Sequence, residues 1–317
     1  MDVATLSEQL LFTTVYLECN SPDGKATGTG FVYAVSVEGP KAEKGVAHFL
    51  VTNRHVLDKA DQVSFQMVRK DEHADQPDLG KAWGANFPGF SKVAWVGHPD
   101  PKVDVAVMSL SFIFNAVHQQ SGDTPFFRAI PPSIAMTDDS SQELDAIEEV
   151  VFVGYPRGIF DSVNLLPIAR RGTTASHPAV NYEGLPAFLM DAAVFPGSSG
   201  SPVLIAQTGS YNAKSGGIVI GNRIVFMGVL AAVHLSPVIG EVKELPTADS
   251  VVVSGMPMNL GIVYKAVAVE ATIDVWLKAN KFKRAPEGVS GPGEESEVDQ
   301  TAATQTQEKV DQADGAG

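Results

Sequence analysis

Cysteine is almost absent from this sequence, since Cys19 is the only one among 317 residues. A single thiol cannot form an intramolecular disulfide, so the disulfide-stabilised class of secreted proteins is excluded and a reducing compartment is favoured. Long apolar runs are also missing, and none reaches the roughly 20 residues that a membrane-spanning helix needs. Residues 1–8 carry Asp2 and no long apolar stretch, unlike a signal peptide. These absences predict a cytoplasmic protein with no membrane partner.

The sequence has no basic stripe either. Its formal net charge is -14, which argues against a nucleic-acid partner because a phosphate backbone would be repelled. Half of that surplus comes from the C-terminal end, where residues 285–317 hold eight acidic residues against the single Lys309. Residues 283–317 have few large apolar side chains, so we expect a disordered acidic tail. The six histidines other than His55 show no ligand spacing, so we expect neither a metal site nor a cofactor.

Short runs rich in valine, phenylalanine, threonine and tyrosine alternate with glycine, proline, asparagine and aspartate, which is typical of an all-β protein. We expect an N-terminal lobe at residues 1–112, a linker at 113–147 and a C-terminal lobe at 148–257. Each lobe offers six candidate strands, as two six-stranded antiparallel β-barrels would require. The expected strands are 11–19, 29–37, 47–53, 62–69, 92–97 and 104–110, then 149–154, 165–175, 186–194, 201–206, 217–221 and 223–234. A short helix is expected at residues 4–10.

The pattern changes after the second set of strands. Between residues 258 and 282 apolar residues fall near a 3.6-residue period, which predicts an amphipathic C-terminal helix packed on the second lobe. The residues that carry this period are Leu260, Val263, Tyr264, Val267, Val269, Ile273 and Leu277.

Three segments carry residues suited to nucleophilic catalysis. Residues 195–202 read Phe-Pro-Gly-Ser-Ser-Gly-Ser-Pro and contain Ser199, while His55 and Asp104 each stand at the edge of an apolar strand. A serine hydroxyl needs a base within hydrogen-bond reach, and that base needs an anionic partner that holds its tautomer. The chain order His55, Asp104, Ser199 is that of the double β-barrel type of triad. An α/β-hydrolase is excluded, because Pro202 and an apolar strand-like run follow the serine where that fold places a helix.

At these residues the chain resembles the trypsin-like serine peptidases, and most closely their HtrA-like bacterial branch. Five segments match in order: residues 27–32, 51–56, 104–107, 151–156 and 190–202. The resemblance implies that His55 is the general base, that Asp104 orients it and that Ser199 is the nucleophile. It also implies that the amides of Gly197 and Ser199 form the oxyanion hole, where a glycine leaves the amide unobstructed. Many HtrA-like proteins carry a PDZ module after the catalytic unit, and we expect none among these 317 residues.

Substrate preference follows from the residues around the serine. The register set by Ser199 places Ala193 at the base of the specificity pocket, with walls from Val194, Ala231, Ala232 and Val233, so we expect a small or apolar P1 residue. Asp191 falls outside that position and is expected to be a structural carboxylate, and His234 to be structural or on the surface. Ser198 stands where zymogen-type relatives carry an aspartate, so activation by a new N-terminal amine is not expected.

Two classes of function stay open at this stage. The first is a serine endopeptidase that acts on a protein or peptide substrate without a cofactor. The second is a protease-fold binding or scaffold protein with an idle triad. A latent protease effector, switched on by an activating partner protein, combines the two.

Overall fold

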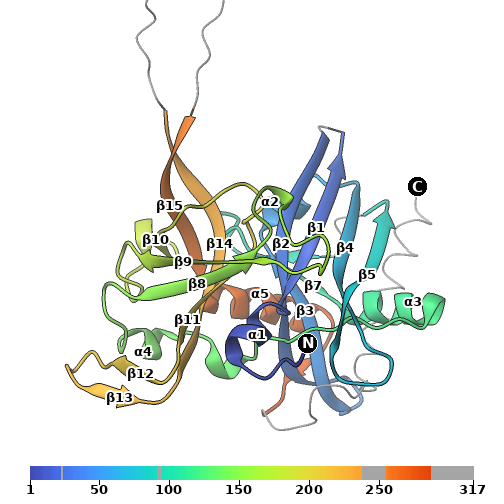
Figure 1. Cartoon of the computed structure of the whole chain (residues 1–317), viewed down its shortest axis with the longest axis horizontal. Helices are drawn as coiled ribbons and strands as arrows, with labels where there is room; N and C mark the ends of the chain where they lie inside the picture. Colours follow the sequence, from blue (N-terminus) through green and yellow to red (C-terminus); the bar gives the residue numbers. More distant parts are fainter. Residues whose placement is uncertain (23, 91–94, 238–254, 287–317) are drawn as a thin grey trace, which may run out of the picture.

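The computed structural model describes residues 1–22, 24–90, 95–237 and 255–286 of the chain. Two β-lobes stand side by side, with helix α5 (Ala266–Ala279) beneath both (Figure 1). The chain begins with the expected short helix, α1 (Leu6–Leu10), at whose start Thr5 and Glu8 bond to each other's backbone amides. No helix within these residues is both long and apolar enough to cross a membrane.

The first lobe is an eight-stranded sheet. Seven strands follow one another in the order β5-β4-β1-β2-β3-β7-β6, and β16 pairs with the last two residues of β2. The expected closed six-stranded barrel is not present among the described residues, where no pair joins β5 to β6. The strands are β1 (Thr14–Ser21), β2 (Gly24–Glu38), β3 (Lys44–Thr52), β4 (Gln62–Lys70), β5 (Pro77–Pro88), β6 (Val96–Gly97), β7 (Ala106–Ser109) and β16 (Lys283–Arg284).

Strand β5 is the longest strand that the sequence did not predict. It pairs with β4 along nearly its whole length, with an irregularity between Val68 and Arg69. Trp83 is fully buried, Ala85 and Phe87 pack on the same core, and the residues between them are exposed, as in a half-buried strand. Residues 80–82 are all exposed, so the alternating run is short, which explains why the pattern did not reveal the strand.

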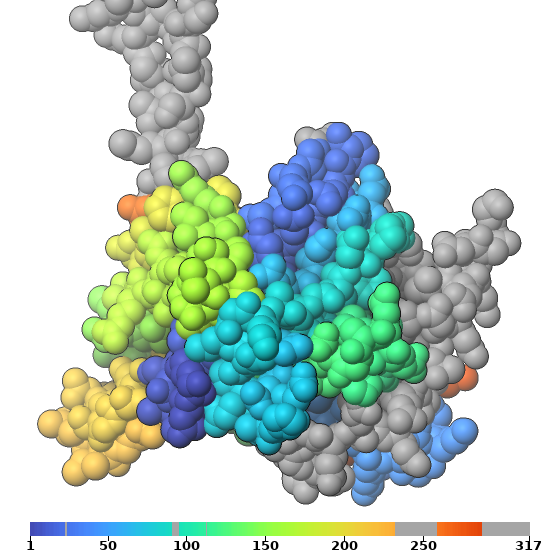
Figure 2. Space-filling view, turned by 45° about the vertical axis from the view of Figure 1, so that its right-hand side comes forward, coloured from blue at the N-terminus to red at the C-terminus, as the bar shows by residue number. Residues whose placement is uncertain are grey.

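The second lobe is a closed six-stranded barrel with the order β10-β15-β14-β11-β8-β9. The predicted strand at 217–221 exists, but it belongs to a separate hairpin that projects from the barrel (lower left in Figures 1 and 2). The barrel strands are β8 (Glu149–Gly154), β9 (Ile168–Thr174), β10 (Ala187–Asp191), β11 (Pro202–Gln207), β14 (Arg223–Pro237) and β15 (Gly255–Lys265). The hairpin is formed by β12 (Ser210–Asn212) and β13 (Ile218–Ile220).

The sixth barrel strand corrects the prediction of a helix over residues 258–282. Residues up to Lys265 form β15, which is paired on both sides, and only then does the chain enter α5. The apolar residues of β15 face both the barrel interior and α5, so their spacing mimics a helical period. The expected tail at 283–317 also begins in a strand, since Lys283 and Arg284 pair with β2. Residues 287–317 lie outside the described part of the chain.

The segment between the lobes contains helices rather than strands. It holds α3 (Ser111–Ser121), a 3-10 turn η1 (Pro132–Ile134) and α4 (Asp138–Ser141). The exact limits of the predicted linker, 113–147, stay a prediction.

One hydrophobic core runs through both lobes. Phe31 of the first lobe packs edge-on against Phe226 of the second, with ring centroids 5.4 Å apart. Helix α5 adds Trp276, whose ring lies 5.0 Å from that of Phe49. Farther out, the loop after β8 lies against β5 (Figure 2). Leu165 of this loop and Leu79 of β5 both pack on a small buried cluster formed by Val3, Phe12, Val68 and Phe126. Such a dry interface holds the lobes in one relative position, which a site shared between them requires.

Candidate active site

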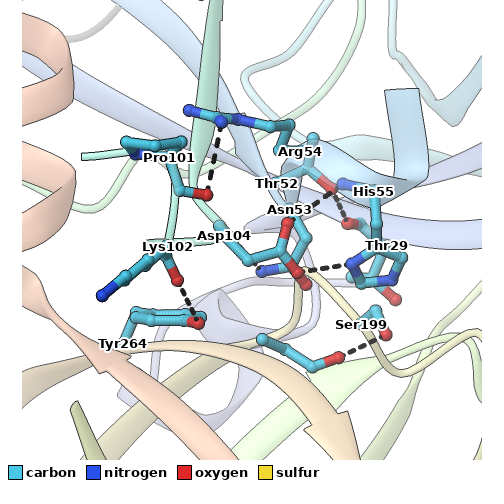
Figure 3. A network of polar contacts seen from close by, with 11 residues as sticks. Thr29, Thr52, Asn53, Arg54, His55, Pro101, Lys102, Asp104, Ser199 and Tyr264 are labelled. Carbon is cyan, nitrogen blue, oxygen red and sulfur yellow. Dashed lines mark hydrogen bonds and ion pairs between the residues drawn. The ribbon is translucent and has the colours of Figure 1, made fainter. Parts of the chain in front are cut away.

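His55 and Asp104 come together at the edge of the first lobe. His55 lies in the short helix α2 (Arg54–Leu57), which follows β3 directly, and Asp104 lies in the loop between β6 and β7. The Nδ1 atom of His55 is 2.5 Å from one carboxylate oxygen of Asp104, and the His55 amide donates to the other oxygen at 3.0 Å. Both carboxylate oxygens are therefore bound to the same residue, which fixes the orientation of the imidazole ring (Figure 3).

The loop that carries Asp104 is held by its neighbours in the same lobe. The side-chain amide of Asn53 donates to the Asp104 carbonyl at 2.6 Å, and Arg54 donates to the carbonyl of His98 at 2.8 Å. Burial lowers the pKa of His98, so that side chain is neutral at physiological pH. From the second lobe, the Tyr264 hydroxyl donates to the carbonyl of Lys102 at 3.1 Å, and burial raises its pKa.

The loop from Phe195 to Gly200, called the Ser199 loop below, begins with a tight turn. Pro196 and Gly197 occupy the two central positions, Gly197 has φ of 88°, and the Ser198 amide closes the turn on the Phe195 carbonyl at 3.0 Å. Proline followed by a residue with positive φ is the signature of a type II turn. A side chain at Gly197 would place its Cβ 2.5 Å from the Tyr155 carbonyl oxygen, so both conformation and space require glycine there.

In the Ser199 loop, two of the four amides from Gly197 to Gly200 have an acceptor and two do not, and the Phe195 amide before the turn has none among the described residues. The amides of Ser198 and Gly200 donate to the carbonyls of Phe195 and Leu230, respectively. The amides of Gly197 and Ser199 have no acceptor among the described residues. An unpaired pair of amides on either side of a serine is suited to binding an anionic oxygen.

The hydroxyl of Ser199 points away from His55 in this structure. Its Oγ donates to the carbonyl of Ala231 at 2.7 Å, and no hydrogen bond joins it to the imidazole. Figure 3 shows Ser199 and His55 entering the same region from different elements. The His55 side chain is 51% exposed, so its second ring nitrogen is open to a ligand or to a rotated serine. The structure thus brings His55 and Asp104 together, whereas the Ser199 hydroxyl is bonded to the Ala231 carbonyl instead of the His55 imidazole.

The residues predicted around the specificity pocket are described in part. Val194 and Ala231 are buried, Ala193 is half-buried, and Asp191 is exposed at the end of β10. The side chains of Ala232, Val233 and His234 lie outside the described residues, although their backbone belongs to β14.

One residue near this pocket escaped the sequence prediction. Gly261 of β15 lies against Val194, and a Cβ there would approach its Cγ2 to 3.1 Å. It pairs with Val233 across the strands. The signal was hidden because this stretch was assigned to a helix.

Ser198 is buried to 1% exposure, and its Oγ has no hydrogen-bond partner. No carboxylate is available at this position for an ion pair with an N-terminal amine, as expected from the sequence. Within the part of the chain that the structure describes, no three histidine, cysteine, aspartate or glutamate side chains are grouped as metal ligands.

Two β-lobes that contribute a histidine-aspartate pair and a Gly-Ser-Ser-Gly loop to one region define the serine protease class with the chymotrypsin-like fold. The family model of the trypsin-like peptidase domain matches residues 28–211, more than half of the 317 residues. The chain therefore belongs to the trypsin-like peptidase family, and the resemblance seen in the sequence is confirmed.

Several solved structures are similar to this chain. The HtrA-type protease AlgW with a tripeptide is 16% identical with a TM-score of 0.45, and the match covers 86% of this chain and 62% of that one. A serine endoprotease from Yersinia pestis is 15% identical with a TM-score of 0.44, covering 87% and 68%. The thermostable serine protease AL20 from an extremophilic microorganism is 14% identical with a TM-score of 0.43, covering 84% and 97%. A search of the curated proteins found no match.

Proposed function

We propose that this protein is a serine endopeptidase with Ser199 as nucleophile, His55 as general base and Asp104 as the group that orients His55. The substrate is a protein or a peptide. The first lobe supplies the base and its partner, and the second supplies the nucleophile, so the site needs both lobes in contact. Cytoplasmic location in a bacterium, an inference from the sequence and its resemblance, is part of the same proposal.

The reaction follows from the geometry of these three residues. Ser199 rotates from the Ala231 carbonyl towards His55, transfers its proton to the imidazole and attacks the scissile carbonyl carbon. The oxygen of that carbonyl becomes an anion and accepts hydrogen bonds from the amides of Gly197 and Ser199. His55 then gives its proton to the leaving amine, and the acyl-enzyme remains. Water repeats the sequence with His55 as base and releases the acid.

One observation carries this proposal. Of the four amides from Gly197 to Gly200, those of Gly197 and Ser199 have no acceptor among the described residues, and these are the two that the reaction needs. An amide without a partner costs free energy where it is shielded from water, so these two amides favour a ligand with negative charge.

A small or apolar P1 residue is part of the proposal. The pocket residues Ala193, Val194, Ala231, Ala232 and Val233 are small and uncharged. Asp191, the only carboxylate among residues 190–199, is exposed at its strand end and does not supply a charge at the pocket base.

The test is covalent labelling with a fluorophosphonate probe, followed by hydrolysis of a peptide library. We expect labelling of the parent protein and of Ser198→Ala, and none of Ser199→Ala or His55→Ala. Ser198→Ala is the matched control, since it removes a hydroxyl one residue away. Absence of labelling in a folded parent protein, together with no cleavage of any peptide, would contradict the proposal.

One observation favours a second candidate, a binding protein or a latent protease that a partner activates. The Ser199 hydroxyl is bonded to the Ala231 carbonyl and not to His55. In that case the protein binds peptides without turnover, and Ser199→Ala leaves the affinity unchanged. Equilibrium binding of a fluorescent peptide to parent and variant separates the two candidates, because a working protease consumes the peptide.

A further inference from the structure

The carbonyl groups of the Ser199 loop are fixed by residues outside the loop. The Pro196 carbonyl accepts from the Arg157 amide at 2.6 Å, the Gly197 carbonyl from the Thr29 hydroxyl at 2.8 Å, and the Ser199 carbonyl from the Thr29 amide at 2.9 Å. In a planar trans peptide the N–H points opposite to the C=O. Fixing the Pro196 carbonyl towards Arg157 therefore turns the Gly197 amide to the opposite side, towards the open site.

Thr29 is the residue on which most of these contacts depend. It lies in β2 of the first lobe, is fully buried, and bonds through its amide and hydroxyl to two residues of the second lobe's loop. Its own carbonyl accepts from the Thr52 hydroxyl at 2.7 Å, three residues before His55. A chain of hydrogen bonds thus leads from the strand that precedes the general base to the loop that carries the nucleophile (Figure 3).

The direction of the Thr29 hydroxyl bond is set by a third group. The Tyr155 amide donates to Thr29 Oγ1 at 3.1 Å, and an amide can only donate. The hydroxyl proton is then free to point at the Gly197 carbonyl. Tyr155 and Arg157 belong to the same turn, η2 (Pro156–Gly158) with its preceding residue, so this turn reaches the Ser199 loop both directly and through Thr29.

Nothing within the loop replaces these contacts. Ser198 stands next to the nucleophile, but its buried hydroxyl has no hydrogen-bond partner. Two bonds close the loop locally: the Ser198 amide donates to the Phe195 carbonyl, and the Ser201 amide donates to the Ser198 carbonyl, which orients the Ser199 amide across that peptide. The Gly197 amide is oriented by the Arg157 contact, and the two Thr29 bonds fix the peptides that follow Gly197 and Ser199.

We propose that Thr29 is a positioning residue, whose hydroxyl and amide hold the peptides that follow Gly197 and Ser199 and thereby keep the Ser199 loop, with its Gly197 and Ser199 amides, in place at the site. The proposal rests on the proposed function, in which these amides bind the oxyanion. It assigns a role to the segment Thr27–Gly30, which the sequence analysis used only as part of the family resemblance. It also explains how the loop keeps its shape with serine at position 198.

The experiment compares Thr29→Val, which replaces the hydroxyl by a methyl group, with Thr29→Ser, which keeps the hydroxyl. Thr272→Val is the matched control, because Thr272 is also fully buried and donates its hydroxyl to a backbone carbonyl, in α5. Each full-length variant is titrated with the fluorophosphonate probe and with a cleaved peptide, and its thermal midpoint is measured. Thr29→Val loses the buried hydrogen bond from the hydroxyl to the Gly197 carbonyl. We therefore expect the probe to label Ser199 about tenfold more slowly in this variant.

The expected result has three parts. Thr29→Val lowers the labelling rate and kcat with little change in KM, Thr29→Ser restores both to within about twofold, and Thr272→Val lowers only the thermal midpoint. A second readout does not need activity. The chain has three Pro-Gly pairs, at 88–89, 196–197 and 292–293, so ¹³C-proline and ¹⁵N-glycine labelling reduces the NMR spectrum to three amide signals, and Pro88→Ala and Pro292→Ala identify the two that do not belong to Gly197.

The Gly197 amide signal is expected to shift in Thr29→Val and not in Thr29→Ser or Thr272→Val. An unchanged Gly197 signal in Thr29→Val overturns the positioning role, even if the parent protein is an active protease. A shifted signal in a protein that never labels supports the positioning role and contradicts the proposed function instead. Labelling of Thr29→Val at the parent rate also overturns the proposal.

Discussion

The two lobes contribute to the site in different ways. In the first lobe, the side chains of His55 and Asp104 have their hydrogen bonds to each other, and Asn53 and Arg54 hold the Asp104 loop from the same lobe. In the second lobe, two carbonyls of the Ser199 loop depend on Thr29, a residue of the opposite lobe. The base and its partner therefore come from one lobe, with one added contact from the Tyr264 hydroxyl of the second lobe to the Lys102 carbonyl, whereas the nucleophile loop depends on the first lobe at two of its carbonyls.

This difference predicts which substitutions will disturb each half of the site. A change inside the first lobe should affect the chemistry of the base and leave the Ser199 loop in place. A change at the lobe contact should disturb the loop while the His55–Asp104 pair persists. The following predictions test this division, beginning with the largest effect.

Asp104→Asn should reduce kcat by about 10⁴-fold at neutral pH, because the amide no longer holds the imidazole in the required tautomer. The thermal midpoint should change little, since asparagine fills the same space. Asp100→Asn, in the same loop, is the control and should keep its activity. Kinetics with a cleaved peptide check this, and an Asp104→Asn variant as fast as the parent would show that Asp104 has no part in the reaction.

Glu148→Ala should destabilise the second lobe by about 3 kcal/mol, because it leaves Arg223 buried without its partner. The two side chains are 7% and 13% exposed and share two hydrogen bonds of 3.0 and 3.2 Å. Asp274→Ala, which removes the exposed partner of Arg284, should cost at most about 1 kcal/mol. Urea denaturation measures both, and equal losses would contradict the difference in burial.

Gly200→Ala should weaken the contact between the lobes. At Gly200 a Cβ would lie 1.8 Å from the Thr29 carbonyl oxygen, so the Ser199 loop and β2 would have to separate. Gly209→Ala is the matched control: its φ is 88° against 89° at Gly200, but nothing lies within 4 Å of its Cβ. Both variants carry the same backbone strain, about 1 kcal/mol.

We therefore expect the thermal midpoint of Gly200→Ala to fall several degrees further than that of Gly209→Ala. Labelling by the fluorophosphonate probe should be lost only in Gly200→Ala. Identical thermal midpoints for Gly200→Ala and Gly209→Ala would mean that the contact between the lobes can open without loss of stability.

Cys19 should not react in the native protein. Burial in the first lobe and the nearby Glu18 raise its pKa to about 12, so the thiolate is scarce at pH 8. Iodoacetamide should modify it only after denaturation, as mass spectrometry can show. Modification of the native protein at the rate of a free thiol would indicate that the interior of the first lobe opens easily, against the view that this lobe is self-sufficient.

His55, Asp104 and Ser199 could be named from the sequence because each stands in a local pattern of strand, turn or glycine. The structure brings His55 and Asp104 into contact, and the catalytic roles of the three residues stay a prediction. The turn at Gly197 is likewise local, since proline and glycine dictate it. The resting bond from Ser199 to Ala231 was beyond the sequence, because a rotamer depends on atoms 32 residues away.

Among the strands that were missed or misassigned, the two longest, β5 and β15, show the opposite case. β5 alternates only over residues 83–88, and residues 263–265 of β15 are all buried, so neither strand displays over its full length the alternation that marks a half-buried strand. Thr29 was visible in the sequence as part of a glycine-rich strand. Its contacts with Gly197 and Ser199 span about 170 residues and follow only from the docking of the lobes.

Helix α5 has a consequence for how the protein is made. It packs on β14 and β15 of the second lobe and on β6 and β7 of the first, and the chain then adds β16 to β2. During synthesis the first lobe leaves the ribosome long before α5, and domains fold largely in that order. The brace that joins the lobes is therefore completed only after both lobes have been synthesised. Until residues 266–284 have left the ribosome, the halves of the site that carry His55 and Ser199 lack the helix that packs on both.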